Sequence, residues 1–133
     1  MNKENIIEML NCDNSGEVQQ KGIELALAEN DLDFVMYHSS DPTYATNCAK
    51  IITSLDYDKC KKYIGDLFTW IESFNNVGAE DIYDYLKKAP EEIISEELVL
   101  AKKFAMRHNN VDALSILSML EKERYNKTGA ENK

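Results

Sequence analysis

Three carboxylates crowd one side of a predicted helix, and their spacing could support chemistry. Glu80 and Asp84 are four residues apart and Asp81 and Asp84 are three apart, so a helix places all of them on one side. Carboxylates gathered in this way can hold a divalent cation or take part in acid–base catalysis. The same pattern is typical of a solvated helix face whose first-turn acids complement the helix dipole. A metal-binding protein or a carboxylate enzyme therefore stays open as an alternative.

The two histidines and three cysteines form no known catalytic or metal-binding motif. His38 precedes a predicted helix start and His108 lies at a predicted helix end, where a histidine interacts favourably with the helix dipole. Cys12, Cys48 and Cys60 match no zinc-site spacing and are interpreted as reduced thiols that pack as small hydrophobic side chains. A Cys–His pair formed by folding stays open. We expect no enzymatic activity, no cofactor and no bound metal.

Tyrosines flanked by acids indicate a binding surface rather than a reaction centre. Tyr85 fits an apolar stripe with Ile82, so Tyr83, two positions away, is expected at the edge of the helix near Glu80 and Asp84. An exposed tyrosine among acids suits the capture of a basic protein, because the ring adds buried area and the acids add steering. Packing of each tyrosine between helices is the alternative. The candidate partner-binding residues are Asp66, Glu72, Glu80, Asp81, Tyr83 and Asp84.

The charge balance excludes some partners and favours others. The 133 residues include 24 acids and 15 bases, for a net charge of −9, which argues against a protein that tracks nucleic-acid phosphates. Residues 1–56 carry 10 acids and 3 bases, whereas residues 101–133 carry 4 acids and 7 bases. No stretch approaches the ~18 uninterrupted apolar residues of a membrane span, and the N-terminal apolar run is too short for a signal peptide. We expect a cytoplasmic protein with an acidic body and a basic partner.

Helical periodicity repeats along the chain, and no segment alternates with a period of two. About seven helices joined by short loops are predicted, which gives an all-α fold of antiparallel helical hairpins. One domain is predicted over residues 1–125, followed by a frayed polar tail over residues 126–133. The predicted helices cover residues 2–10, 15–30, 42–55, 59–74, 79–89, 95–107 and 111–125, with a short apolar piece at 32–36.

A small residue followed by apolar residues recurs at intervals close to the length of one helical hairpin. Gly22, Ala49, Ala79 and Ala113 are 27, 30 and 34 positions apart. This spacing favours a stack of helix pairs, each burying one face on the next, wound as a right-handed superhelix. A compact irregular bundle is the alternative fold.

The middle of the chain, over roughly residues 15–90, contains a distinctive set of packing motifs: Asn47 to Ile52, Trp70-Ile71-Glu72, Asn75, and Gly78-Ala79 with Ile82 and Leu86. In these motifs the chain resembles a bacterial family of small HEAT-like proteins. The resemblance implies a short HEAT-like repeat fold and no catalytic residue, and some members of that family are candidate immunity proteins in polymorphic-toxin loci. Asn76 and Val77 stand where the family has an aromatic residue and a proline, which weakens the case for a shared binding loop.

These observations predict a non-enzymatic protein-binding module. In its concrete form it is an immunity protein that blocks a basic toxin through an acidic helical face. The other alternative is a scaffold that associates with itself. Such a contact is expected on the last helix, through Leu114, Ile116, Leu117, Met119 and Leu120.

Overall fold

The computed structural model describes the backbone of residues 2–131 and the side chains of residues 2–124. Within that range every regular element is a helix, which confirms the all-α prediction. No helix among the described residues is long and apolar enough to span a membrane. The helices are α1 (Lys3–Met9), α2 (Gly16–Leu27), α3 (Asp33–Tyr37), α4 (Pro42–Thr53), α5 (Tyr57–Cys60), the 3-10 helix η1 (Lys61–Tyr63), α6 (Ile64–Trp70), α7 (Ala79–Lys87), α8 (Glu91–Arg107) and α9 (Val111–Glu131).

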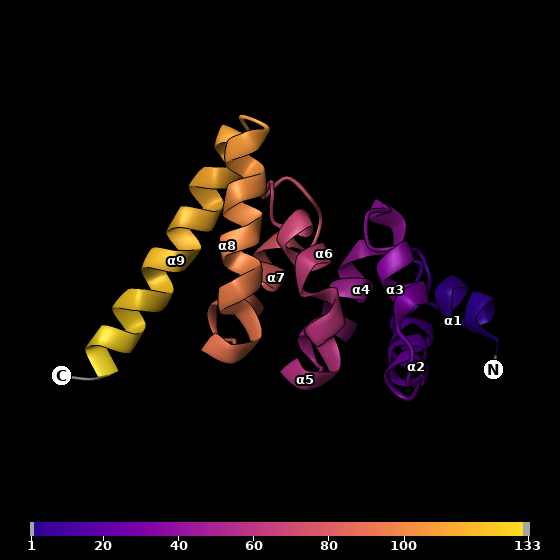
Figure 1. Ribbon diagram of the computed structural model, residues 1–133. Helices are drawn as coiled ribbons and strands as arrows, with labels where there is room; N and C mark the ends of the chain where they lie inside the picture. Colours follow the sequence, from indigo (N-terminus) through magenta and orange to yellow (C-terminus); the bar gives the residue numbers. More distant parts are fainter. Residues whose placement is uncertain (1, 132–133) are drawn as a thin grey trace.

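The helices follow one another along one direction, from α1 at one end of the molecule to α8 and α9 at the other (Figure 1). Contacts link alternate helices in two rows. In one row α2 contacts α4, α4 contacts α7, and α7 contacts α9. In the other row α1 contacts α3 and α6 contacts α8. Each row therefore joins segments that lie far apart in the sequence.

Polar side chains begin three helices at the positions that the sequence predicts. Asn2 accepts a 2.6 Å hydrogen bond from the backbone N–H of Glu4, at the start of α1. The Ser15 hydroxyl caps α2, and the Asp41 carboxylate caps α4, whose first residue is Pro42. These caps satisfy N–H groups that have no partner within the helix. Proline is tolerated at the first helical position because its missing N–H has no partner there anyway.

The single helix predicted over residues 59–74 is wrong. That stretch forms α5, η1 and α6, and α6 ends at Trp70. The Trp70 indole donates a 2.7 Å hydrogen bond to the carbonyl of Val77, and the Asn76 amide donates a 2.9 Å bond to the carbonyl of Trp70. Residues 71–78 therefore fold back across the end of α6. Apolar periodicity alone does not reveal these side-chain bonds to the backbone.

Two other predicted boundaries also differ from the structure. The helix predicted to open at Ser95 begins at Glu91, directly after Pro90, which acts as its N-cap. The last helix continues past the predicted end at Tyr125 to Glu131. Fraying of the 126–133 tail stays a prediction, and residues 132–133 lie outside the described residues.

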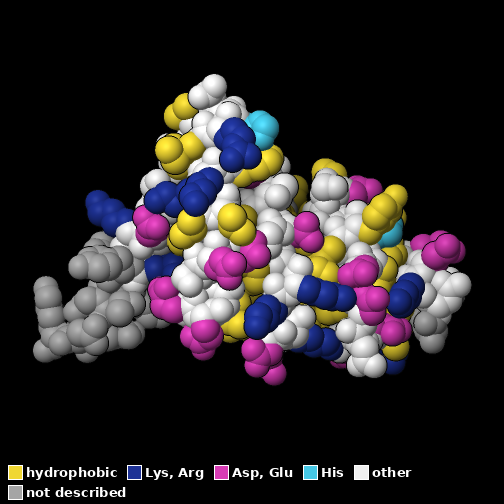
Figure 2. Space-filling view, viewed as in Figure 1, with side chains coloured by type: hydrophobic (Ala, Val, Ile, Leu, Met, Phe, Trp, Pro, Cys, Tyr) yellow, Lys and Arg dark blue, Asp and Glu magenta, His cyan; other side chains and the backbone are white. Residues whose placement is uncertain are grey.

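The surface at the α8–α9 end of the molecule carries exposed apolar side chains. Figure 2 shows basic and apolar side chains gathered around the end of α8 that joins α9. The exposed apolar residues there include Phe104, Met106 and Val111. In the predicted self-association helix, α9, Leu117 and Leu120 are buried. Leu114 and Ile116 are partly buried and Met119 is exposed, so the self-association of α9 stays a prediction. Most of the exposed apolar residues at this end lie on α8.

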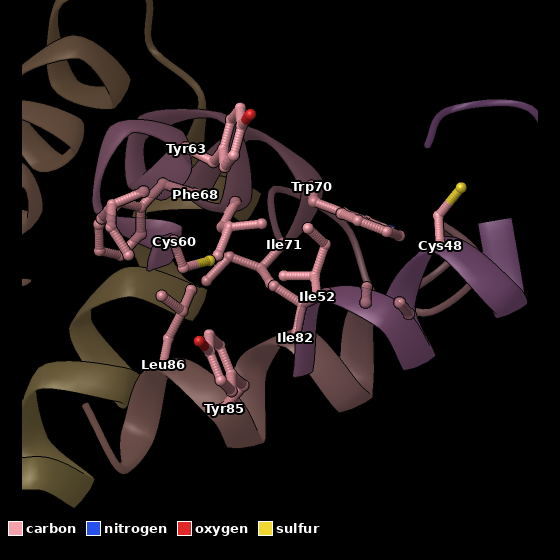
Figure 3. Packing of buried hydrophobic residues seen from close by; sticks show 14 of the residues in the cluster. Cys48, Ile52, Cys60, Tyr63, Phe68, Trp70, Ile71, Ile82, Tyr85 and Leu86 are labelled. Carbon is pink, nitrogen blue, oxygen red and sulfur yellow. The ribbon is translucent and has the colours of Figure 1, made fainter. Parts of the chain in front are cut away.

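The core runs the length of the molecule between the two rows. Ile82, Tyr85 and Leu86 of α7 point towards Phe68 and Ile71 in the segment around the end of α6 (Figure 3). Burial of such side chains is the main driving force for folding. The small residues of the predicted repeat all lie on helices of one row, α2, α4, α7 and α9, and are buried there: Gly22, Ala49, Ala79 and Ala113.

Close approach explains the small residue in α2. A Cβ atom added to Gly22 would lie 2.8 Å from the Cβ of Met9, closer than side-chain atoms normally approach. α1 and α2 therefore pack backbone against backbone at this crossing.

Arg124 of α9 anchors the last pair of helices to α7. It is 8% exposed, and its guanidinium donates hydrogen bonds to the carbonyls of Leu86 and Lys87, where α7 ends. It also lies 3.2 Å from the Glu91 carboxylate. A buried cation at a helix C-terminus satisfies carbonyls that have no partner within the helix and interacts favourably with the dipole.

Candidate partner-binding site

A pocket of about 560 Å³ lies between α3, the start of α4, α6 and the loop of residues 71–78. It is called the acidic pocket here. A position between helices is typical of ligand sites in helical proteins. It is lined by Asp33, Met36, Tyr37, Ser39, Ser40, Pro42, Ala45, Tyr63, Asp66, Thr69, Trp70, Asn75, Asn76 and Val77.

Trp70 forms a buried, hydrogen-bonded wall of the acidic pocket. The indole ring is 7% exposed and is held to the loop through its hydrogen bond to Val77. Tyr37 also lines the pocket; it is 82% exposed and its ring packs edge-on against the His38 ring, 5.1 Å between centroids. An exposed aromatic ring beside a fixed one offers a partner side chain two apolar surfaces.

The charge in the acidic pocket is negative. Its lining contains two carboxylates, Asp33 and Asp66, and no Lys, Arg or His. The Asp33 carboxylate accepts a 2.8 Å hydrogen bond from the Tyr63 hydroxyl, which fixes its direction. Burial, and then the hydrogen bond that its hydroxyl donates to the Asp33 carboxylate, raise the pKa of Tyr63. This tyrosine therefore stays a neutral donor.

Lys62 of the chain itself lies at the rim beside Tyr63, in surroundings that favour its charged form. Its ammonium lies 3.5 Å from the Asp33 carboxylate and 5.0 Å from the centroid of the Tyr63 ring. The Tyr63 side chain first, and then the Asp31 and Asp33 carboxylates, raise the pKa of Lys62. Both an aromatic face and nearby carboxylates favour the charged form of an amine.

The structure distributes the predicted candidate residues over several depressions. Asp66 lines the acidic pocket, and Glu72 lines a separate groove between α6 and α8. Glu80 and Asp81 line a shallow depression of about 250 Å³ beside residues 74–78. Thr69 is common to the first two sites. The predicted single face is therefore divided by α6 and the loop that follows it.

Tyr83 is not at an exposed edge, and this prediction is wrong. The residue is 6% exposed because α7 lies between α4 and α9. Its ring packs edge-on against Phe74. Burial first, and then the Glu123 carboxylate on α9, raise the pKa of its hydroxyl. Asp84 is exposed but lies 3.6 Å from the ammonium of Lys87.

Sequence reasoning missed Asp33 and the role of Trp70. Asp33 opens the short helix α3, and only the fold brings it near Asp66, which lies 33 residues further along the chain. Tyr37 carried a weak signal, because it sits near a predicted helix end among polar residues. The hydrogen bond from Trp70 to Val77 depends on the loop conformation, and no local sequence pattern predicts it.

The structure gives the carboxylate-metal alternative no site in the part of the chain that it describes. Among these residues no three His, Cys, Asp or Glu side chains lie together as metal ligands would. The two buried thiols, Cys48 and Cys60, also show no activation, because burial raises the pKa of each. Burial raises the pKa of Cys48 to about 12, and its Sγ donates to the carbonyl of Val35 at 3.5 Å. A thiolate at this position is disfavoured.

Comparison of the chain with protein-family models, with curated proteins and with solved structures found no match. The candidate site is therefore interpreted from its own geometry.

Proposed function

We propose that this protein is a non-enzymatic binding module for a basic protein, and that the acidic pocket holds one Lys or Arg side chain of that partner. One observation carries the proposal. The pocket combines two carboxylates, Asp33 and Asp66, with the rings of Tyr37, Tyr63 and Trp70. No basic side chain lines it, and the Lys62 ammonium, which lies outside the lining, pairs with Asp33 at 3.5 Å and leaves Asp66 without an ion pair among the described residues. Aromatic faces and carboxylates together are the surroundings that a desolvated cation prefers.

The charge of the whole chain supports the same partner. A net charge of −9 attracts a basic protein over a distance and accelerates association at low salt. The acidic pocket supplies the short-range contact that a diffuse negative charge lacks. A cytoplasmic immunity protein that neutralises a basic bacterial toxin is the concrete form of this proposal.

The proposed architecture is a short HEAT-like right-handed superhelix. Two rows of helices, with small residues buried along one row, support a stack of hairpins. A stack of this kind presents an extended surface between successive hairpins, as helical-repeat proteins do when they bind partners. The acidic pocket would then lie between the hairpin of α3 and α4 and the next one.

The test compares two pairs of substitutions that remove the same charge. Asp33→Asn with Asp66→Asn neutralises the acidic pocket and keeps an oxygen that can accept the Tyr63 hydrogen bond. Asp81→Asn with Asp84→Asn neutralises the α7 surface predicted from the sequence. The probe is a fluorescent peptide of Arg, Gly and Ser, and its affinity is measured by anisotropy at low and high salt.

The pocket variant is expected to bind the peptide roughly tenfold more weakly, because each lost ionic contact is worth about 1 kcal/mol or less when partly exposed. The α7 variant is expected to bind nearly as tightly as the native chain. Binding that is equally weakened by both pairs would mean that only the overall charge matters. If only the Asp81→Asn, Asp84→Asn variant lost affinity for the peptide, the binding site would lie on α7 and not in the acidic pocket.

A further inference from the structure

A second depression adjoins the acidic pocket on the other side of α6. This α6–α8 groove has a volume of about 280 Å³. It shares Thr69 with the acidic pocket, so the two sites flank one helix. The groove is lined by Gly65, Phe68, Thr69, Glu72, Glu97, Leu100, Ala101, Phe104, Ala105, Ala113 and Leu117.

The walls of the groove include apolar side chains that solvent reaches. Leu100 is 52% exposed and Phe104 is 57% exposed, although both belong to a well-formed helix. The Phe104 ring packs against His108, 4.2 Å between centroids, which orients it at the groove. Neighbouring exposed apolar residues of this kind mark protein-binding surfaces.

The charges at the groove are carboxylates. Glu72 and Glu97 line it, and its lining contains no basic side chain. In the part of the chain that the structure describes, neither carboxylate forms an ion pair with Lys or Arg. Lys103 and Arg107 are exposed on α8 but do not line the groove. Apolar walls with unpaired acids are complementary to an apolar side chain that is flanked by cations.

We propose that the α6–α8 groove binds an apolar side chain from a basic amphipathic segment of the same partner whose cation enters the acidic pocket. This inference rests on the proposed function for the identity of the partner. One segment crossing α6 at Thr69 would contact both sites. The groove then adds affinity and selects among basic partners, because a partner that lacks the apolar residue leaves Leu100 and Phe104 in water.

The experiment uses three labelled peptides with matched length. The first contains Arg, Gly and Ser only, the second adds Leu and Phe on one helical face, and the third repeats the second with Glu in place of Arg. The native chain is expected to bind the second peptide at least tenfold more tightly than the first. The third peptide is expected to bind more weakly than the second.

Gly65 allows the groove to be blocked without disturbing the core. A Cβ atom there would meet only the Glu97 carboxylate, at an ordinary 3.6 Å. Gly65→Leu is therefore expected to abolish the extra affinity of the second peptide and to leave the affinity of the first peptide unchanged. Gly16→Leu is the matched control, because a Cβ at Gly16 meets nothing within 4 Å. A second variant, Leu100→Ser with Phe104→Ser, removes the apolar walls and is expected to have the same effect.

The outcomes separate the two proposals. If the native chain binds the second peptide no more tightly than the first, the groove inference is wrong. It is also wrong if both groove variants still bind the second peptide more tightly than the first. Neither result affects the proposal for the acidic pocket. If the groove variants weaken the second peptide but the Asp33→Asn, Asp66→Asn pair does not, the proposed function at the pocket is wrong. Failure of all peptides to bind overturns both. Sedimentation tests whether the native chain is a dimer that Gly65→Leu dissociates. Such a result would mean that a second copy of the chain occupies the groove, and it would overturn the inference.

Discussion

The indole Nε1 of Trp70 donates a 2.7 Å hydrogen bond to the carbonyl oxygen of Val77, across the loop that follows α6. The Asn76 amide returns a bond to the Trp70 carbonyl. The loop ends at Gly78, whose φ of +84° turns the chain into α7. The end of α6, one wall of the acidic pocket and the start of α7 are therefore positioned by the same few contacts.

Replacing Trp70 with Phe is expected to loosen this wall. Trp70→Phe keeps most of the apolar ring but leaves the Val77 carbonyl without its donor, so the free energy of unfolding should fall by roughly 1 kcal/mol. Affinity for the Arg, Gly and Ser peptide should fall as well. Urea unfolding followed by circular dichroism measures the first effect. Unchanged stability and unchanged affinity would show that the bond does not organise the pocket.

The fold was more predictable from the sequence than the site was. Caps such as Ser15 and Asp41 and the stop at Pro90 act within a few residues, so local patterns locate the helices that they begin or end. The break after Trp70 depends on bonds from its indole and from Asn76, and periodicity across residues 59–74 gave no sign of it.

The residues that form the candidate site could be identified only from the tertiary structure. Asp66 was identified from its position on a polar helix face, but only the tertiary fold brings Asp33 of α3 into the lining of the same pocket. Tyr83 was misplaced because α9 covers it, and a helical wheel of one segment does not show which neighbours lie on each side. In an inner helix a polar-looking face can still be buried.

Two glycines should respond in opposite ways to the same substitution. Gly78→Ala forces a left-handed backbone on an L-residue and places a Cβ 2.9 Å from the Cβ of Ala49, so it should destabilise the chain by roughly 1–2 kcal/mol. Gly65→Ala, in the exposed face of α6, should stabilise it by up to about 1 kcal/mol. Urea unfolding of the two variants in parallel tests both signs. Equal effects would contradict the conformation of Gly78.

Arg124→Met should separate the last helix pair from α7. The variant keeps the length and the apolar stem of the side chain but leaves the carbonyls of Leu86 and Lys87 without a donor. Hydrogen bonds from a charged group are worth roughly 1.5–3 kcal/mol, so a loss of about 2 kcal/mol in unfolding free energy is expected. Glu91→Gln, which keeps an acceptor on an exposed partner, should cost far less. Equal losses of unfolding free energy in the two variants would mean that the Arg124–Glu91 ion pair, and not the hydrogen bonds to the carbonyls, provides the stability.

Alkaline pH should destabilise the folded chain. Burial raises the pKa of Cys48 from 9.0 to about 12 and also raises that of Cys60. Above about pH 9 the unfolded thiols ionise while the buried ones stay protonated, so the free energy of unfolding falls as the pH rises towards 12. The raised pKa values of the buried tyrosines act in the same direction. Urea unfolding at about pH 7 and about pH 10 measures the loss.

A thiol reagent gives an independent check on this burial. At about pH 8, one thiol, the exposed Cys12, should react quickly in the native chain, and Cys48 and Cys60 should react only on unfolding. Cys12→Ser should remove the fast phase of the reaction. Rapid reaction of more than one thiol in the native chain would contradict the packing around α4 and α5.

The central claim is that the acidic pocket itself receives a cation, and amide chemical shifts test it most directly. A ¹⁵N-labelled chain is titrated with an amide-blocked arginine, and the shift of each backbone resonance is mapped. The largest shifts are expected at the residues that line the pocket, including Asp33, Met36, Asp66 and Asn76, and they should disappear with the Asp33→Asn, Asp66→Asn pair. Shifts spread evenly over all acidic surfaces, or centred on Glu80 and Asp81, would contradict it.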